Sequence, residues 1–483
     1  MAGDRAAPLG SAPEGADHTS PGCCFWRRHS SESRCIDDTR FDRIEGAARM
    51  PTRSFRRENG LPSFPVLTAA PAMGEVHGRN RRPCKQGRES MPTTERALTA
   101  SETAFILAGF GPVVVRTAFA GTFDPVLLED AWQRLGDEYP LLRCRIIEGQ
   151  DGFGFALQDS MSKVTAGADS FEQDISRRIE DGMVSQLSLH QTADTAALTL
   201  SVDHAVSDAR LVLVLSRALL RIYATLLRGE FPPSAPRPVF EAGLEELFSG
   251  KYAPGRPETP EVVEEPAVLS GGPGVPPSGF GVQHLELDQA TTTEVTEFAR
   301  ASRISVTSLM CGAVSGAVRA RAPEAGGPLP VTLCIPVDFR ERLAPPIDPD
   351  AQLCGALPCL VTVPVAADDE PAEVGARVAA GLREALERAE PQRTLLAQSL
   401  SPAPPPTMTF MVSNIGVVED PALPDVPRVT GSRFAATLRG PVPAMFVGTV
   451  GGRLTLDVVY DRAFHNDGEM GGVMASVEAA LHI

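Results

Sequence analysis

Short apolar runs and helix-period runs alternate along most of this chain. Apolar or alternating stretches predict strands over 113–120, 141–148, 195–204, 283–287, 331–337, 408–412, 444–450 and 453–460. A helical period of apolar positions predicts helices over 125–138, 208–228, 290–302, 306–321, 374–386 and 467–481. The two glycines at 451–452 predict a primed turn that joins the last two strands into a hairpin. This mixture of strands and helices predicts an α/β fold.

The pattern divides the chain into four parts. Residues 1–90 lack sustained periodicity and are rich in Pro, Gly, Ser and Arg, so we expect a disordered extension and a natural start near Met91. The first half of the folded part is expected over 91–228 and the second half over 281–483. Between them, residues 229–280 are rich in Pro, Gly and Glu and predict a connector too polar to be a packed element.

The amino-acid composition of the chain argues against several classes of function. The net charge is −16, and the acidic excess lies within 91–483, which argues against nucleic acid or an anionic membrane as a partner. No run approaches the roughly 20 apolar residues of a membrane span, so no integral membrane segment is expected. Prolines interrupt the apolar stretch after Met50, which disfavours an export signal. The nine cysteines form no regular framework, which predicts free thiols in the cytoplasm and no metal site.

The most informative segment is residues 201–209, SVDHAVSDA, where a predicted strand meets a predicted helix. His204 continues the parity of the apolar strand positions, so it should point to the buried face while Asp203 points away. Ser207 and Asp208 are favourable residues for a helix N-terminus. A histidine held beside a carboxylate at such a turn is a candidate general base. The same spacing also fits a structural histidine followed by a helix cap.

Three further motifs accompany this segment in a fixed order. They are YPLLR at 139–143, PVDFR at 336–340 with LAPP at 343–346, and SNIG at 413–416. With the His204 segment, they make residues 91–483 resemble the condensation-domain and chloramphenicol acetyltransferase-like superfamily. Within it, the chain resembles polyketide-associated acyltransferases of the phthiocerol/phthiodiolone dimycocerosyl transferase type.

The resemblance implies two lobes, each a mixed sheet covered by helices, with a tunnel between them. It implies that His204 and Asp208 are the catalytic pair in that tunnel, with His204 as the general base. Asp208 would fix the loop by pairing with Arg340, which supports the site. Ser413 and Asn414 are candidates for contact with the oxyanion or the tunnel. From the residues alone, Arg340 also fits a surface cation, and Ser413 and Asn414 also fit turn residues at a strand end.

The chain departs from the family pattern HHxxxDG at two positions. Asp203 replaces the first histidine, and we expect it to support the loop and to raise the pKa of His204. Ala209 replaces the glycine, and it would be strained if the loop required a positive φ there. His465, after the last strand, is expected to be an exposed loop histidine rather than a second base.

The function implied is an acyltransferase that moves an acyl group from a thioester to a hydroxyl of a lipid or polyketide-type acceptor. Acyl-CoA or a phosphopantetheine-linked acyl thioester would be the co-substrate, with no permanently bound cofactor. An acyl-carrier protein or polyketide synthase would be the partner of a monomeric enzyme. Two alternatives remain open: a degenerate member that binds a carrier protein or lipid without turnover, and an amide-forming condensation-type domain.

Overall fold

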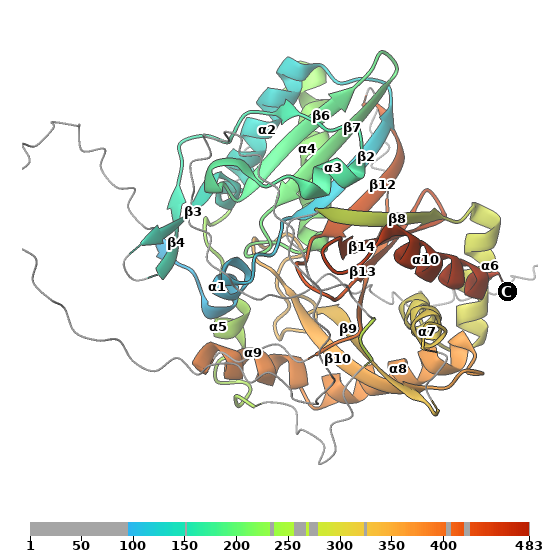
Figure 1. The fold of residues 1–483 in the computed structure, drawn as a ribbon. Helices are drawn as coiled ribbons and strands as arrows, with labels where there is room; N and C mark the ends of the chain where they lie inside the picture. The colour runs from blue at the N-terminus through green and yellow to red at the C-terminus, as the bar shows by residue number, and fades with distance from the viewer. Residues whose placement is uncertain are drawn as a thin grey trace, which may run out of the picture. The chain divides into compact units, whose positions relative to one another are not determined.

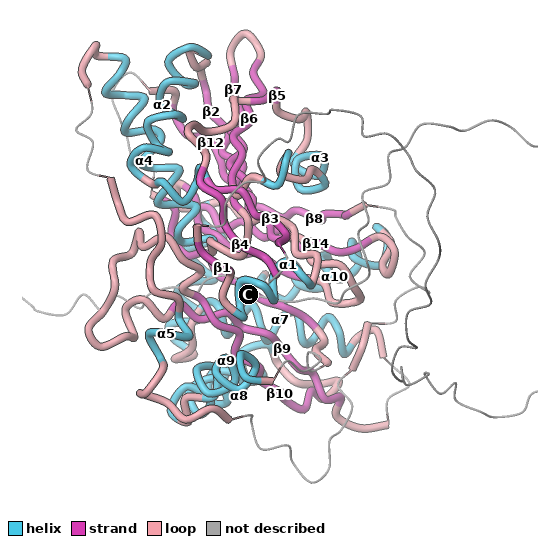
Figure 2. The backbone as a smooth tube through the Cα atoms, turned by 90° about the vertical axis from the view of Figure 1, so that its left-hand side faces the viewer, coloured by secondary structure: helices cyan, strands magenta, loops and turns pink. Residues whose placement is uncertain are grey.

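A five-stranded sheet forms the centre of the first half. The computed structural model describes residues 95–482, apart from 150–151, 232–235, 256–266, 270–278, 323–325, 402–406 and 420–425. The strand order is β12-β2-β7-β6-β5. The bounds are Val113–Ala120 for β2, Thr165–Ala166 for β5, Ser185–Gln191 for β6, Thr195–Val202 for β7 and Arg428–Ala436 for β12. Helices α2 (Pro125–Glu138) and α4 (Ala209–Leu227) lie on one side of this sheet and α3 (Phe171–Ser176) on the other (Figure 2).

A small three-stranded sheet lies beside helix α1, with the order β1-β4-β3. Its strands are Arg96–Ala97 for β1, Cys144–Gly149 for β3 and Gly152–Leu157 for β4, and α1 spans Ala100–Leu107. The strand predicted over 141–148 starts later, because Pro140–Arg143 forms a 3-10 turn before β3. The backbone N–H of Leu141 in that turn donates to the side chain of Gln352, at 3.1 Å. This partner lies far away in the sequence, so local periodicity did not reveal the turn.

A six-stranded sheet forms the centre of the second half, with the order β10-β9-β11-β13-β14-β8. Figure 1 shows its strands β9, β10, β13, β14 and β8 among the helices of this half. The bounds are Phe280–Glu286 for β8, Leu329–Asp338 for β9, Ala356–Val365 for β10, Phe410–Val418 for β11, Ala444–Val450 for β13 and Arg453–Asp461 for β14. The main helices are α6 (Gln289–Ala301), α7 (Val306–Arg319), α8 (Pro371–Glu387), α9 (Glu390–Leu400) and α10 (Asp467–Leu481). Strand β11 is parallel to both of its neighbours, so the sheet is mixed. The predicted α/β class is therefore confirmed.

The six-stranded sheet is buried on both faces. Val412 and Val447 belong to a core shared with helices α7, α8 and α10. Met411 and Phe446, which point the other way, belong to a core that continues into the first half. Strand β12 strengthens this connection, because it comes from the second half and pairs along β2 in the sheet of the first. The two halves therefore share both a hydrophobic core and a sheet.

Several expectations from the sequence need correction. The connector 229–280 contains a packed helix, α5 (Leu244–Phe248), whose Leu244 and Phe248 are buried. Strand β11 does not end at Ser413 but continues to Val418, with a bulge near Asn414. By contrast, Gly451 and Gly452 both have positive φ, at 56° and 76°, as the predicted primed turn requires. The predicted disordered extension over 1–90 and the start near Met91 lie outside the described residues.

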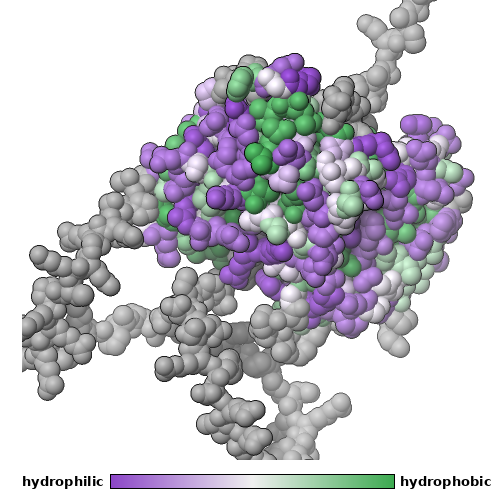
Figure 3. Space-filling model, turned by 90° about the horizontal axis from the view of Figure 1, so that it is seen from above, coloured by the Kyte–Doolittle hydropathy of each residue, from purple (hydrophilic) through white to green (hydrophobic). Residues whose placement is uncertain are grey.

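The surface of the described residues is mixed in polarity. Figure 3 shows one face on which hydrophilic residues surround a strip of apolar ones. Within the described part of the chain, no helix combines the length and the apolar character needed to cross a bilayer. The described cysteines form no disulfide bond, and four of the five are buried.

Replacing Leu456 by alanine tests how much the packing of β14 in the hydrophobic core contributes to the stability of the fold. Leu456 is fully buried, so Leu456→Ala should lower the free energy of unfolding by about 2–5 kcal/mol through lost burial and a residual cavity. The matched control is Leu400→Ala, because Leu400 is 76% exposed at the end of α9 and should change stability by about 0.5 kcal/mol or less. Urea denaturation of both variants measures the difference, and equal losses would contradict the packing.

Candidate functional site

The turn between β7 and α4 is held by its own short side chains. The carboxylate of Asp203 accepts a hydrogen bond from the N–H of Ala205 at 2.8 Å, and the hydroxyl of Ser207 donates to the carbonyl of Asp203 at 3.0 Å. Asp208 is the N-cap of α4 and accepts from the N–H of Leu211 at 3.0 Å. Ala209 is the first residue of that helix and has no positive φ, so the strain considered for it is absent.

Two aromatic rings pack against the imidazole of His204. Its side chain stacks on Phe105 of α1, with ring centroids 4.7 Å apart and an interplanar angle of 13°. Phe110 approaches edge-on, at 5.5 Å. His204 is only 1% exposed. The sequence pattern does not indicate either contact, because both phenylalanines lie about a hundred residues before His204 and meet it only in the tertiary structure.

The protonation state of His204 follows from this burial. Burial lowers the pKa of His204 to about 4, although its backbone hydrogen bonds and the charge of Asp208 act in the opposite direction. The pKa of His204 is therefore lowered overall, and a contribution of Asp203 to it stays a prediction. Nδ1 lies 3.0 Å from the carbonyl oxygen of Ser207. A carbonyl only accepts, so Nδ1 carries the proton of the neutral ring and Nε2 is the basic nitrogen.

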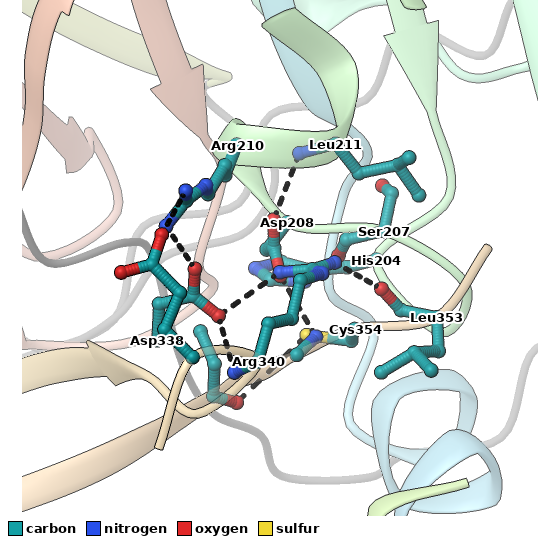
Figure 4. Close-up of polar contacts among 12 residues, drawn as sticks. His204, Ser207, Asp208, Arg210, Leu211, Asp338, Arg340, Leu353 and Cys354 are labelled. Carbon is teal, nitrogen blue, oxygen red and sulfur yellow. Dashed lines mark hydrogen bonds and ion pairs between the residues drawn. The ribbon is translucent and has the colours of Figure 1, made fainter. Parts of the chain in front are cut away.

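A buried ion pair connects this turn to the second half (Figure 4). Nη1 of Arg340 lies 2.6 Å from Oδ2 of Asp208, and both side chains are fully buried. Nη2 of Arg340 donates to the carbonyl of Leu353 at 2.6 Å. Burial alone would lower the pKa of Arg340, but the carboxylates of Asp208 and Asp338 outweigh it and raise this pKa. Arg340 is therefore not a surface cation.

The ion pair continues into a wider network that the sequence reading missed. Asp338 accepts from Nη1 of Arg340 at 3.2 Å and from Nη1 of Arg210 at 2.7 Å. Arg210 in turn reaches Glu341 at 2.5 Å. Arg210 lies in the first turn of α4, two residues after Asp208. This close spacing in the sequence indicated that one turn carries both an acidic and a basic side chain. Carboxylates and guanidinium groups therefore alternate from the start of α4 to the end of β9.

Ser413 and Asn414 lie within β11 rather than at its end. Ser413 is fully buried. The amide of Asn414 donates to the hydroxyl of Thr307 on α7 at 2.9 Å, and its oxygen accepts from the N–H of Gly416. These side-chain hydrogen bonds of Asn414 lead to α7 and to its own strand. Contact of either residue with an oxyanion stays a prediction.

A small pocket borders the turn on the side of Phe105. Its lining includes Phe105, Ala205, Cys354 and Leu357, with Glu102 and Glu245 at more polar positions. This pocket does not by itself test the tunnel expected between the two lobes, which stays a prediction. Among the described residues, no three His, Cys, Asp or Glu side chains are grouped so that they could hold a metal ion.

The turn between β14 and α10 repeats the hydrogen bonding of the turn between β7 and α4. Asp461 accepts from the N–H of Ala463 at 3.0 Å, as Asp203 does from Ala205, and Asn466 is the N-cap of α10. Arg462 stands where the first turn has His204. It forms ion pairs with Asp467 and, from the first half, Glu172. The second turn therefore carries an ion-paired, structural arginine at the position where the first turn carries a histidine.

His465 was expected to be an exposed loop residue, and this expectation was wrong. It is 3% exposed, and its Nε2 lies 2.8 Å from the carbonyl oxygen of Pro441. Its Nδ1 lies 3.5 Å from Glu469. These neighbours belong to the second turn, so His465 packs there and not beside His204.

The chain is similar in sequence to known proteins over part of its length. Residues 276–459 match the family described as the phthiocerol/phthiodiolone dimycocerosyl transferase C-terminus. The phthiocerol/phthiodiolone dimycocerosyl transferases of Mycobacterium tuberculosis and Mycobacterium bovis are 27% identical over 259 residues, which cover 47% of this chain and 58% of theirs. The chain is similar to these transferases. The match spans little more than half of their length.

Solved structures share the fold over most of the chain. Polyketide synthase associated protein 5 from Mycobacterium tuberculosis has a TM-score of 0.66 and 19% identity, covering 81% of this chain and 98% of that one. Trichothecene 15-O-acetyltransferase from Fusarium sporotrichioides has a TM-score of 0.60 and 13% identity, covering 80% and 94%. The first condensation domain of the calcium-dependent antibiotic synthetase has a TM-score of 0.58 and 13% identity, covering 80% and 97%. These likenesses confirm the fold that the resemblance implied.

The low pKa of His204 predicts a pH-dependent loss of stability. The folded value of about 4 lies below the ordinary value near 6.5, so the unfolded chain binds more protons between these pH values. The contribution of neutral His204 is therefore complete above about pH 6.5 and is lost as the pH falls towards 4, by at most about 1.4 kcal/mol per pH unit. Urea denaturation of the wild type and His204→Gln should give a stability difference that shrinks with falling pH. A pH-independent difference would contradict the shift.

Removing Arg340 should destabilise the fold strongly. Arg340→Ala leaves Asp208 buried without its cation, which should cost about 3–5 kcal/mol of unfolding free energy. A suitable control is Arg134→Ala, because Arg134 pairs with Asp130 on the surface of α2 and such pairs contribute about 1 kcal/mol or less. Urea denaturation compares the two. Equal small losses of unfolding free energy in the two variants would show that the buried ion pair contributes no more to stability than the surface pair.

Proposed function

We propose that this chain is an acyltransferase that moves an acyl group from a thioester to a hydroxyl. The single observation that carries the proposal is His204, which is neutral and has its Nδ1 proton directed at the carbonyl of Ser207. This arrangement leaves Nε2 as the base. The likeness to proteins named as transferases supports the reaction class, although the match covers only part of their length.

In the proposed reaction, the acceptor hydroxyl attacks the thioester carbonyl carbon. Nε2 of His204 takes the hydroxyl proton as the new C–O bond forms, because an alcohol is a weak nucleophile at neutral pH. Collapse of the tetrahedral intermediate breaks the C–S bond, and the departing sulfur takes the proton back from His204. Proton and acyl group are both accounted for, and the histidine returns to its neutral form.

Asp208 supports this chemistry without exchanging the proton. Its two oxygens are already occupied by the N–H of Leu211 and by Nη1 of Arg340. It therefore holds the turn whose Ser207 carbonyl orients the imidazole. We infer that its role, and that of Arg340, is to position His204.

The donor belongs to the thioester class, as acyl-CoA or as an acyl group on a carrier protein. The acceptor is a hydroxyl of a lipid or polyketide-type molecule. The names of the similar proteins, a dimycocerosyl transferase and a polyketide synthase associated protein, support this class. An acyl-carrier protein or polyketide synthase is then the partner of the chain.

Burial of His204 favours a second candidate, which is binding of a carrier or lipid without turnover. Phe105 and Phe110 cover the imidazole, and His204 is 1% exposed. Turnover requires at least one of these rings to move, so that an acceptor hydroxyl comes within hydrogen-bond distance of Nε2. Binding of a carrier or lipid without turnover does not require either ring to move.

Acyl transfer by the purified chain separates these candidates. Acyl-CoA and acyl-carrier donors of several chain lengths are supplied with hydroxyl acceptors, and release of the free thiol is followed. The wild type should turn over, and His204→Gln should lower kcat by about 10²–10⁴-fold through loss of the base. His190→Gln is the matched control, since His190 lies on β6 with Asp169 as its partner, and it should keep the wild-type rate.

Two outcomes would overturn the assignment. If His204→Gln keeps the full rate, His204 is not the base. If the wild type binds acyl donors in equilibrium dialysis but releases no thiol with any of them, the chain is a binding protein.

A further inference from the structure

Asp208 receives two hydrogen bonds on the same oxygen, and both donors come from the second half. The first donor is Nη1 of Arg340, at 2.6 Å, and the second is the backbone N–H of Gly355, at 2.8 Å. Gly355 directly precedes β10 and lies between Cys354 and Ala356. Nothing in the sequence motifs marked this glycine.

Gly355 has no space for a side chain. A Cβ atom built on its backbone would lie 2.5 Å from Cζ and 2.9 Å from Cγ of Arg340, and closer still to Nη1. Real Cβ contacts essentially never fall below 3.0 Å. The φ of Gly355 is not positive, so the glycine is required for the space that it leaves and not for its backbone conformation.

Arg340 cannot easily move aside. Its guanidinium is fully buried, with Nη2 on the carbonyl of Leu353 at 2.6 Å and Nη1 on Asp208 and Asp338. The backbone N–H of Arg340 also donates to Asp338, at 3.1 Å. A methyl group at position 355 would therefore displace the guanidinium, the segment 353–355, or both.

We propose that Gly355 is a positioning residue of the acyl-transfer site. The absence of a side chain lets the Arg340 guanidinium lie against the backbone, and the Gly355 N–H completes the hold on Asp208. The assignment rests on the proposed function, because it gives the glycine a role in orienting the base.

The effect reaches His204 through four residues of chain. Asp208 is the N-cap of α4, and the preceding Ser207 presents the carbonyl that fixes Nδ1 of His204. A shift of Asp208 therefore changes both the orientation of the imidazole and its exclusion from water. Misplacement of a catalytic group by about 1 Å can cost about 10²-fold in rate.

The test is Gly355→Ala, with Gly316→Ala as the matched control. Gly316 lies in α7, and a Cβ there meets nothing within 4 Å. Gly355→Ala should lower kcat by about 10²-fold. Water admitted beside His204 should raise its pKa from about 4 towards the ordinary value near 6.5. The acidic limb of the kcat/KM profile should move to higher pH with it, whereas Gly316→Ala should change neither.

The pKa of His204 is also measured directly, by NMR titration of its Cε1–H signal. This readout is independent of turnover. If the wild type shows no acyl transfer, the proposed function fails, and the titration still decides whether Gly355 controls the environment of His204. An unchanged His204 pKa in folded Gly355→Ala, or an unchanged rate where the wild type is active, would overturn the positioning role.

A second variant covers the case in which Gly355→Ala does not fold. Arg340→Lys removes the planar guanidinium that a Cβ would meet but keeps a cation for Asp208. In the double variant Gly355→Ala/Arg340→Lys, folding should be recovered, or the urea midpoint should lie above that expected from adding the two single losses. Strictly additive losses, or no recovery of folding, would show that the glycine does not act through Arg340.

Discussion

The structure depends on one buried ion pair, Asp208 with Arg340. Two opposite charges without solvent are stable only if each is compensated and hydrogen-bonded. Asp208 meets this condition by also capping α4, and Arg340 meets it through the Leu353 carbonyl and Asp338. The pair thus ties the first turn of a helix in the first half to the end of a strand in the second. Any movement between the halves must break it.

The same principle holds in the corresponding turn of the second half, with different side chains. The turn after β14 repeats the hydrogen bonds of the turn after β7, but Arg462 stands in place of His204 and pairs with Glu172. Each half therefore has a strand-to-helix turn whose charged side chain meets the other half. With β12 inserted beside β2 and a core shared across the six-stranded sheet, these contacts give the His204 turn a rigid support.

The environment of His204 reflects a compromise between basicity and access. Aromatic rings and the protein interior lower its pKa to about 4, so the ring is neutral at physiological pH and can accept a proton. The same burial leaves His204 only 1% exposed to solvent. A base of low pKa drives proton removal less strongly than one near neutrality. The supports around Asp208 therefore contribute most by holding the imidazole in one orientation.

The sequence alone determined the local structure. Periodicity placed β2, α2, β13 and α10 at their observed bounds, because side-chain alternation and helical spacing depend on neighbours within a few residues. The motif at 201–209 and its Arg340 partner were also found from the sequence, through the resemblance to a family. Only the tertiary structure decided where β12 pairs, which rings cover His204, that His465 is buried and that Gly355 lies against Arg340. Those features arise from contacts between segments distant in the chain, where burial and available space depend on packing that no local pattern encodes.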